Sequence, residues 1–502
     1  MKKFTVSFIC IFLAFLISFS VVSELVGTNS KYASNQDYMQ SENLALKAEK
    51  TKLNDSNNKT VYRFSKRNGG EVVLDFGERI SFNNVILKEK GLNVKSFSLL
   101  SSDDGIDFAE FYKNDKIEFH RLCTFDSINA RYLKLVINES DALPKIRELE
   151  IYNELPKKNE NFKVTAYSTI GSSIYEIIDD DKINEKEKDD MICNLIDEKY
   201  YDTVTDYIQI GNVKWDEDGN VLTTGWDNVE RDEDKYYGRM MKNLHSVLDK
   251  TGTNIVVTIL NPSGENGNAR VVKSITENRD TLITNMIAFA NKYEIDGIDL
   301  DWEFPMSQDE FDAYNSFLQE LKARMNTEMW NKEKSTLSLA LATWALKYTP
   351  ETIECIDYVN VMGYDILDQD GQHSSFFSSC VQAADYIESQ GFSKEQINIG
   401  FPFYGTWEGG RMEQYSYNAI SEEISPFNNF YTMKKSDTQE DRYTYFNSQA
   451  IIRDKTAYSY LKGYGGVMIF SLYCDLPADN EKSLTNSIHK YLEEVRANES
   501  IN

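Results

Sequence analysis

Two patterns of hydrophobic and polar residues divide the chain. Over residues 43–153, short apolar runs alternate with turn residues, and helical periodicity is almost absent. This pattern is typical of a β-sandwich, in which short strands are separated by turns such as residues 103–105. We therefore predict a small all-β module, with candidate strands at residues 72–76, 85–87, 97–100, 132–137 and 149–152.

Over residues 161–495, strand-like apolar runs alternate with segments of helical periodicity, such as residues 281–293, 310–326 and 379–390. Eight strands alternating with helices predict a (β/α)8 TIM barrel. A doubly wound sheet is the alternative, but no glycine-rich phosphate loop follows the first strand. The eight predicted strands are residues 163–169, 203–211, 254–260, 295–304, 336–343, 358–365, 397–404 and 466–472.

The fourth predicted strand carries an acidic face. At the strand period of two, Asp299, Asp301 and Glu303 point to one side, and apolar residues point to the other. Neighbouring carboxylates lie about 6.6 Å apart, which corresponds to roughly 2–3 kcal/mol of repulsion at an effective dielectric near 20. At least one of the three is therefore expected to hold a proton near neutral pH, as a general acid must.

Two structural interpretations of this strand remain open. A solvated edge strand would explain the alternation, but not the flanking apolar residues or Pro305, which ends the run. A calcium site would use the Asp-x-Asp spacing, but the glycine-turned loop that usually presents such ligands is absent.

Length, charge and composition limit the number of domains and the classes of molecule that the protein is expected to bind. A length of 502 residues favours two domains. The 54 basic residues are outnumbered by 80 acidic ones, and the net charge of -26 disfavours binding to nucleic acid. Six scattered cysteines and four distant histidines form no disulfide framework or metal-ligand cluster in the sequence, so no metal or cofactor is expected.

Residues 1–27 have the pattern of a signal peptide or a membrane anchor. Lys2 and Lys3 precede a long apolar run, and Val21 and Ser23 are suitable small residues before a cleavage site. The run is also long enough to remain as an anchor. The protein is therefore expected to be secreted or at the cell surface, with membrane contact only through this segment if it is uncleaved.

The all-β segment resembles the discoidin-like, galactose-binding-like modules that are often attached to secreted glycosidases. The matching phrases are residues 74–78, 98–105, 130–135 and 146–152. The aspartate-glycine and tryptophan phrase usual near the start of such modules is absent, so sugar binding and a spacer or stabilising role both stay open. Residues 154–160 are the predicted linker.

The second segment resembles glycoside hydrolase family 18, the chitinases and their relatives. The family signature corresponds to Asp296, Asp299, Asp301 and Glu303, followed by Phe304-Pro305. Phrases on the sixth, seventh and eighth predicted strands agree in order and position. They are residues 361–365, 400–405 and 465–470.

The resemblance implies a role for each acidic residue. Glu303 would protonate the glycosidic oxygen and then activate water, while the 2-acetamido carbonyl of the substrate acts as nucleophile. Asp301 would bind the acetamido N–H, Asp299 would share its proton, and Tyr364 would donate to the acetamido carbonyl. Met362, Asp365 and Phe470 would line the sugar site. Three further aromatic residues are candidates for the same site, and ordinary packing is the alternative for each of them: Tyr404, Trp407 and Tyr167.

Asp296 has the opposite parity, so we interpret it, with Gly297, as a structural part of the motif at the start of the strand. Phe470 stands where the family usually has tryptophan, and it lacks the indole N–H and some stacking area. The third strand runs into Leu260 to Gly264 instead of a serine-glycine-glycine turn. The segment between the seventh and eighth strands is short, which leaves little room for an α+β insertion and predicts a shallower, more open cleft.

The expected function is a secreted glycosidase that cleaves β-1,4 bonds next to N-acetylglucosamine with retention of configuration. Chitin or chito-oligosaccharides are the first substrate class. An endo-β-N-acetylglucosaminidase acting on glycoprotein glycans and a peptidoglycan hydrolase are alternatives with the same chemistry. The alternative of another class is a non-catalytic lectin, but such relatives characteristically lose the final glutamate, and Glu303 is present.

Overall fold

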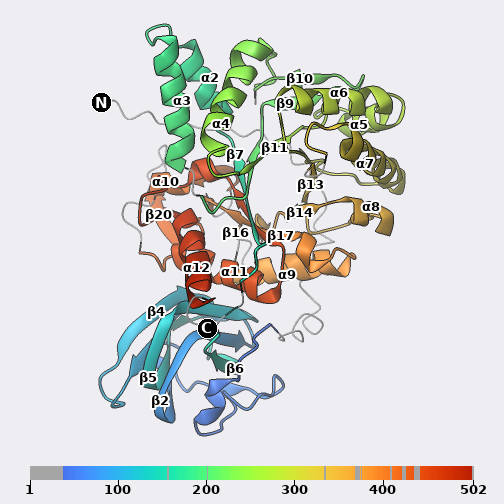
Figure 1. Ribbon diagram of the computed structural model, residues 1–502. Helices are drawn as coiled ribbons and strands as arrows, with labels where there is room; N and C mark the ends of the chain where they lie inside the picture. Colours follow the sequence, from blue (N-terminus) through green and yellow to red (C-terminus); the bar gives the residue numbers. More distant parts are fainter. Residues whose placement is uncertain are drawn as a thin grey trace.

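The computed structural model describes residues 38–499, except 155, 157, 200–201, 226, 333–334, 368–372, 375, 408–409, 421–424 and 435–440. An all-β module lies below an α/β barrel, as expected (Figure 1). The predicted signal or anchor, residues 1–27, lies outside the described residues. Within the described part, no helix is both long enough and apolar enough to cross a bilayer.

The module contains one antiparallel sheet with the strand order β1-β6-β2-β5-β3-β4. The candidate strands at 72–76 and 85–87 are both parts of β2, whose 20 residues pair with the equally long β5. Register shifts at residues 75–80 and 82–84 form bulges, and bulges let a long strand bend around its own core. The strands are β1 (Tyr62–Arg63), β2 (Gly70–Glu89), β3 (Val94–Ser102), β4 (Ala109–Asp115), β5 (Arg121–Ser140) and β6 (Lys145–Tyr152).

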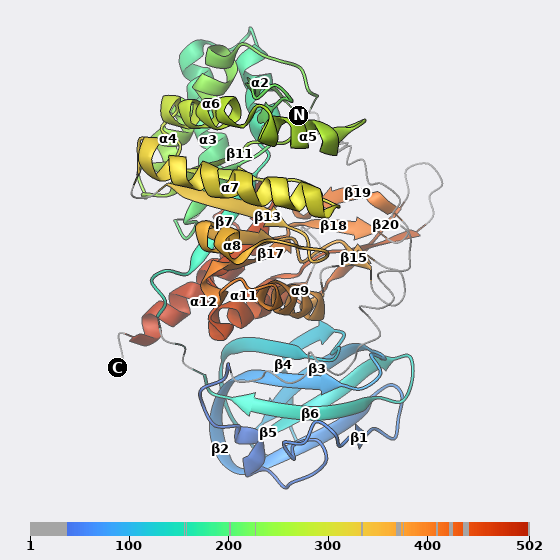
Figure 2. The same ribbon diagram turned by 90° about the vertical axis from the view of Figure 1, so that its right-hand side faces the viewer.

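Eight parallel strands close the predicted barrel, and helices surround it (Figures 1 and 2). The strands are β7 (Lys163–Ser168), β8 (Asp206–Gln209), β11 (Asn254–Thr258), β12 (Gly297–Leu300), β13 (Thr336–Leu341), β14 (Tyr358–Val361), β17 (Ile397–Pro402) and β22 (Gly466–Phe470). The helices are α2 (Gly171–Asp179), α3 (Glu185–Lys199), α4 (Arg239–Leu248), α5 (Gly267–Thr276), α6 (Arg279–Lys292), α7 (Gln308–Glu328), α8 (Pro350–Cys355), α9 (Phe377–Ser389), α11 (Gln449–Lys462) and α12 (Leu484–Glu499).

The segment between β17 and β22 differs from the expectation. Its four strands form an antiparallel sheet with the order β19-β18-β21-β20, so the prediction that this segment is too short for an α+β insertion is wrong. Antiparallel strands can be joined by tight turns, so a sheet needs little chain. The insertion consists of β18 (Tyr404–Trp407), β19 (Gly410–Ser416), α10 (Tyr417–Ile420), β20 (Phe430–Lys434) and β21 (Asp441–Tyr445).

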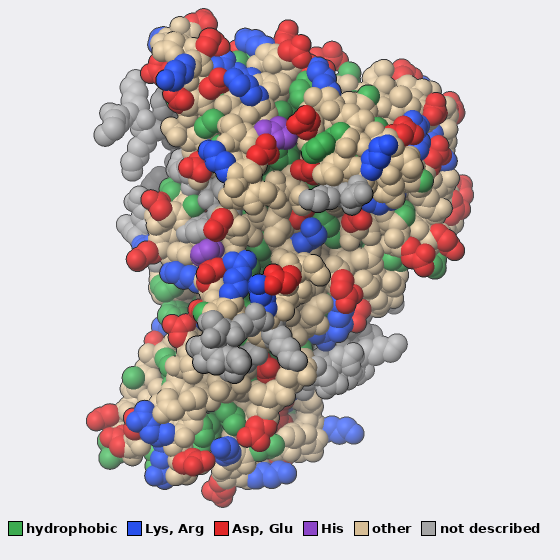
Figure 3. Space-filling view, in the orientation of Figure 1, with side chains coloured by type: hydrophobic (Ala, Val, Ile, Leu, Met, Phe, Trp, Pro, Cys, Tyr) green, Lys and Arg blue, Asp and Glu red, His purple; other side chains and the backbone are tan. Residues whose placement is uncertain are grey.

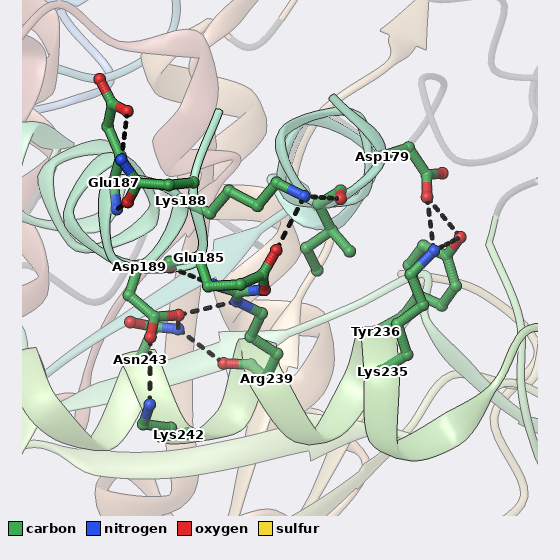
Figure 4. A network of polar contacts seen from close by, with 12 residues as sticks. Asp179, Glu185, Glu187, Lys188, Asp189, Lys235, Tyr236, Arg239, Lys242 and Asn243 are labelled. Carbon is green, nitrogen blue, oxygen red and sulfur yellow. Dashed lines mark hydrogen bonds and ion pairs between the residues drawn. The ribbon is translucent and has the colours of Figure 1, made fainter. Parts of the chain in front are cut away.

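A polar network ties helices α3 and α4 together on the side of the barrel opposite the module (Figures 1 and 4). Arg239 of α4 donates to Asp189 of α3 at 2.7 Å and also pairs with Glu185. Lys242 lies 3.1 Å from the other oxygen of Asp189. On the face shown in Figure 3, acidic and basic side chains are interspersed over both bodies.

A buried ion pair joins the module to the barrel. Arg121 of β5 and Asp454 of α11 are 3.0 Å apart, with side chains 1% and 0% exposed. Asp454 also accepts hydrogen bonds from the Tyr112 hydroxyl at 2.5 Å and the Thr124 N–H at 2.8 Å. All three partners belong to the module, and a buried carboxylate needs such partners to offset its desolvation.

Candidate active site

The row of three acidic residues, Asp299, Asp301 and Glu303, begins inside the barrel. Asp299 of β12 is fully buried and accepts three hydroxyl hydrogen bonds, from Ser338 (2.6 Å), Thr258 (2.8 Å) and Tyr167 (3.0 Å). Burial raises the pKa of Asp299 to about 6, although these donors oppose the shift. The hydroxyls come from three other strands, which hold the carboxyl group in one orientation.

Asp301 follows β12, because this strand has only four residues and ends at Leu300. Its Oδ1 atom is shielded from solvent and has no hydrogen-bond partner among the described residues. Burial raises the pKa of Asp301 well above its usual value, and the charges of Glu303 and Asp299 raise it further. A shielded oxygen without a donor is suited to accept an N–H group from a ligand.

The Glu303 side chain is accessible to solvent at the C-terminal end of the strands. Protein packed around it, together with the charge of Asp365, raises the pKa of Glu303 to about 7. A carboxyl group with this pKa is partly protonated at neutral pH, while it remains open to a substrate. Burial and Asp365, which lies outside the acidic face, cause this shift, whereas the sequence predicts it from repulsion along that face.

Aromatic residues from other strands gather beside the carboxylates. Phe470 at the end of β22 stacks on Tyr364, with ring centroids 6.1 Å apart and an interplanar angle of 22°. Phe470 also contacts the rings of Tyr404 (6.3 Å) and Tyr167 (5.8 Å). The charges of Asp365, Asp301 and Glu303 all act on the Tyr364 hydroxyl, which places this tyrosine within their field.

Asp365 has a left-handed backbone, with φ at +56°, and its Oδ2 accepts the Tyr404 hydroxyl at 2.8 Å. Burial raises the pKa of Asp365 to about 6. This carboxyl therefore connects the loop after β14 to the start of the insertion at β18. Because its charge acts on Glu303, Asp365 can also tune the proton affinity of that residue.

The remaining candidates lie elsewhere. Asp296 accepts the Ile255 N–H at 2.9 Å, at the start of β12 and away from the row. A Cβ on Gly297 would lie 2.8 Å from the Thr336 carbonyl oxygen, so glycine permits the close approach of β13. Met362 follows β14 and is half-buried, and the side chain of Trp407 lies outside the described part of the chain.

Several supporting residues were not predicted from the sequence. Thr258 and Ser338 stand at the same register as Asp299 on the two neighbouring strands, so strand pairing would have identified them. Asn268 of α5 holds both neighbours of Glu303. Its Oδ1 accepts the Trp302 indole N–H at 3.1 Å, and its Nδ2 donates to the Phe304 carbonyl at 3.0 Å. No local pattern marks Asn268, because this contact depends on how α5 packs over the loop.

Comparison with known proteins gives similarities in both segments. Residues 184–475 match the model of glycosyl hydrolases family 18, and residues 30–149 match the F5/8 type C domain. The chain is 26% identical over 280 residues to chitinase A1 of Niallia circulans, covering 43% of this chain and 39% of that protein. A 104-residue stretch is 38% identical to the killer toxin alpha/beta subunits of Kluyveromyces lactis, covering 18% of this chain and 9% of that protein.

The chain thus spans less than half the length of these two curated relatives. A chitinase structure from Bacteroides thetaiotaomicron has a TM-score of 0.49 and 21% identity, covering 66% of this chain and 97% of that one. The resemblances seen in the sequence motifs are confirmed by the two family models. Because the first model matches more than half of the chain, this protein belongs to glycosyl hydrolase family 18 and carries an F5/8 type C domain at its N-terminal side.

Proposed function

We propose that this protein is a retaining glycosidase that cleaves β-1,4 bonds next to N-acetylglucosamine, with chito-oligosaccharides as the first substrate class. The observation that carries the proposal is the row of Asp299, Asp301 and Glu303, all with raised pKa values. The row ends in a solvent-accessible carboxyl group beside stacked aromatic rings. The family-18 match and the similarity to a protein named chitinase A1 also support this substrate class.

In the proposed mechanism, protonated Glu303 donates its proton to the glycosidic oxygen while the bond to C1 breaks. The acetamido carbonyl oxygen of the substrate forms a bond to C1 and gives a cyclic oxazolinium ion. Asp301 accepts the acetamido N–H through its unpaired Oδ1 and stabilises the positive charge, and Tyr364 donates to the acetamido oxygen. Water then attacks C1 as Glu303 takes its proton, and the bond between C1 and the acetamido oxygen breaks, which restores the acetamido group and retains the configuration at C1.

A thiazoline mimic of the cyclic intermediate is the direct test of acetamido participation. It should inhibit hydrolysis of an N-acetylglucosamine oligomer competitively, because it presents the fused-ring geometry of the intermediate to Asp301. Initial rates at several inhibitor concentrations give the measurement. Hydrolysis that is indifferent to the thiazoline would remove this mechanism. Parallel assays on chitin oligomers, N-glycoproteins and peptidoglycan separate the three substrate classes.

The pH dependence should respond to Asp365. Activity requires protonated Glu303, so kcat/KM of the native enzyme should decline as pH rises through about 7. Asp365→Asn removes a negative charge that raises the pKa of Glu303, so the alkaline limb should move to lower pH by up to about one unit. Asp309→Asn, an exposed carboxyl change in the first turn of α7, is the control. An unmoved limb in Asp365→Asn would show that Asp365 does not tune the proton affinity of Glu303.

We also propose that the chain is exported, since residues 1–27 combine basic residues with an apolar run. N-terminal sequencing of protein recovered from the medium and from membranes distinguishes a cleaved signal from an anchor. Recovery of the chain only from the cytoplasmic fraction would refute export.

A further inference from the structure

Helix α9 of the barrel obtains an N-terminal cap from the module. Its own cap residue, Phe376, makes no side-chain capping hydrogen bond. Instead, Oε2 of Glu118 accepts the backbone N–H of Ser378 at 2.9 Å, and both residues are buried. The first N–H groups of a helix lack intrahelical partners, and a carboxyl oxygen is a favourable acceptor for them.

The loop that carries Glu118 fits closely against the start of α9. The Lys116 ammonium lies 4.1 Å from the ring centroid of Phe376, and His120 stacks on Phe377 at 6.0 Å and 21°. Lys116 and Glu118 have φ values of +36° and +64°, a left-handed conformation that non-glycine residues rarely adopt. Such a backbone persists only where surrounding contacts hold it, so this loop is shaped by its position on the barrel.

Helix α9 packs against the backbone that presents Tyr364. A Cβ on Gly363 would lie 3.2 Å from the Cβ of Ala383 in α9, so helix and strand end are in close contact there. Tyr364 follows directly, and its ring lies 3.0 Å from the position of a Cβ on Gly400. A shift of α9 would therefore press on Gly363, the residue that precedes Tyr364.

A second connection runs through helix α11. Asn429 of the insertion donates to Asn114 of β4 at 2.7 Å, and its Oδ1 accepts the N–H of Ser448, the cap residue of α11, at 2.9 Å. The neighbouring Asn447 donates to the carbonyl of Pro402, the last residue of β17, at 3.1 Å. Tyr404, which donates its hydroxyl hydrogen bond to Asp365, follows two residues after Pro402.

We propose that the module is a positioning element of the active site, in which Glu118 acts through α9 on Tyr364 and Asn114 acts through α11 on Tyr404. In a (β/α)8 barrel, each helix begins at the C-terminal end of the preceding strand, the end that carries the chemistry. The module therefore holds α9 and α11 at their catalytic ends, and Figure 2 shows both helices directly above its sheet. The kinetic test of this proposal, a change in kcat, rests on the proposed function. The structural test, a change in backbone hydrogen exchange, does not.

The test compares Glu118→Ala with Glu118→Gln in the full-length protein. Alanine removes the acceptor for Ser378, and glutamine keeps one. Glu118→Ala should lower kcat on an N-acetylglucosamine oligomer about tenfold with KM changed less than about twofold, because Tyr364 is misplaced. Glu118→Gln should restore kcat to within about twofold of the native value. Backbone hydrogen exchange of residues 358–365 should rise in the alanine variant and return in the glutamine variant.

Arg239→Ala is the control for general loosening, because it breaks the α3–α4 network (Figure 4) on the side of the barrel opposite the module (Figure 1). It should leave kcat and the exchange of residues 358–365 unchanged. Equal losses in Arg239→Ala and Glu118→Ala would overturn the proposal, as would native kcat and exchange in Glu118→Ala.

Two further cases keep the test decisive. If Glu118→Ala does not fold, Asn114→Ala takes its place. This variant should show faster backbone hydrogen exchange of residues 400–406. Native exchange of these residues would count against the proposal. If the native protein cleaves no N-acetylglucosamine oligomer, the proposed function fails, and the exchange comparison alone decides the positioning role.

Discussion

Glu303→Gln is expected to lower kcat on an N-acetylglucosamine oligomer by about 10²–10⁴-fold while the oligomer still binds. The amide keeps the size of the side chain but cannot donate its proton as an acid. Steady-state hydrolysis and calorimetric binding on the same preparation measure the two effects separately. Native hydrolysis in this variant would refute the proposed role of Glu303, whereas binding without hydrolysis by the unmodified protein would favour the lectin alternative.

Glu303→Gln should also change how Tm depends on pH, and this measurement checks that the variant is folded. The pKa of Glu303 is raised from 4.5 to about 7 in the folded protein. Between these pH values the folded state binds more protons than the unfolded state, so this carboxyl group destabilises the fold progressively as pH rises through that window. Glu303→Gln should therefore raise Tm relative to the native protein at pH 8 but not at pH 4. An equal change at both pH values would show that the carboxyl is not perturbed by its site.

Asp454→Ala is expected to destabilise the whole protein by about 3–5 kcal/mol, the typical result of breaking a buried ion pair. The change leaves Arg121 buried and removes the acceptor for Tyr112 and Thr124. Burial raises the pKa of Asp454 to about 6 even beside Arg121, so desolvation offsets much of the attraction within the intact pair. The loss therefore comes mainly from the orphaned guanidinium. Urea unfolding followed by circular dichroism gives the measurement.

Asp75→Ala is the matched control. Asp75 and Arg131 form an ion pair with two contacts, at 2.8 and 2.9 Å, but both side chains are about 40% exposed. Removing Asp75 should change the free energy of unfolding by less than about 1 kcal/mol, because solvent screens the pair. Comparable losses in the free energy of unfolding for Asp454→Ala and Asp75→Ala would mean that burial does not determine how much the interface ion pair contributes to stability.

Most of the architecture could be predicted because hydrophobic periodicity is a local property of the chain. The change from short strands to alternating strands and helices correctly indicated an all-β module followed by a barrel. The spacing of Asp299, Asp301 and Glu303 also predicted one acidic face, but only Asp299 lies within β12, and the other two residues follow the end of this strand. Their order along the chain is sufficient for that inference, because adjacent side chains of an extended segment point to opposite sides.

The shape around that face depended on contacts between distant residues. The insertion sheet was missed because β18 pairs with β21, which is distant in sequence, as well as with the adjacent β19, and segment length alone does not reveal such pairing. The end of β12 at Leu300 and the position of Asn268 beside Glu303 also follow from packing against neighbouring elements.

The sequence by itself determined that a barrel would form and that one of its strands would end in acidic residues. Only the tertiary structure decided what surrounds those acids. It buried Asp299 among hydroxyl groups from three other strands, and it placed Glu118 of the module at the start of a barrel helix. The physical reason is the separation along the chain over which each effect acts. Side-chain alternation acts between neighbours in the chain, whereas desolvation, capping and ion pairing act between neighbours in space.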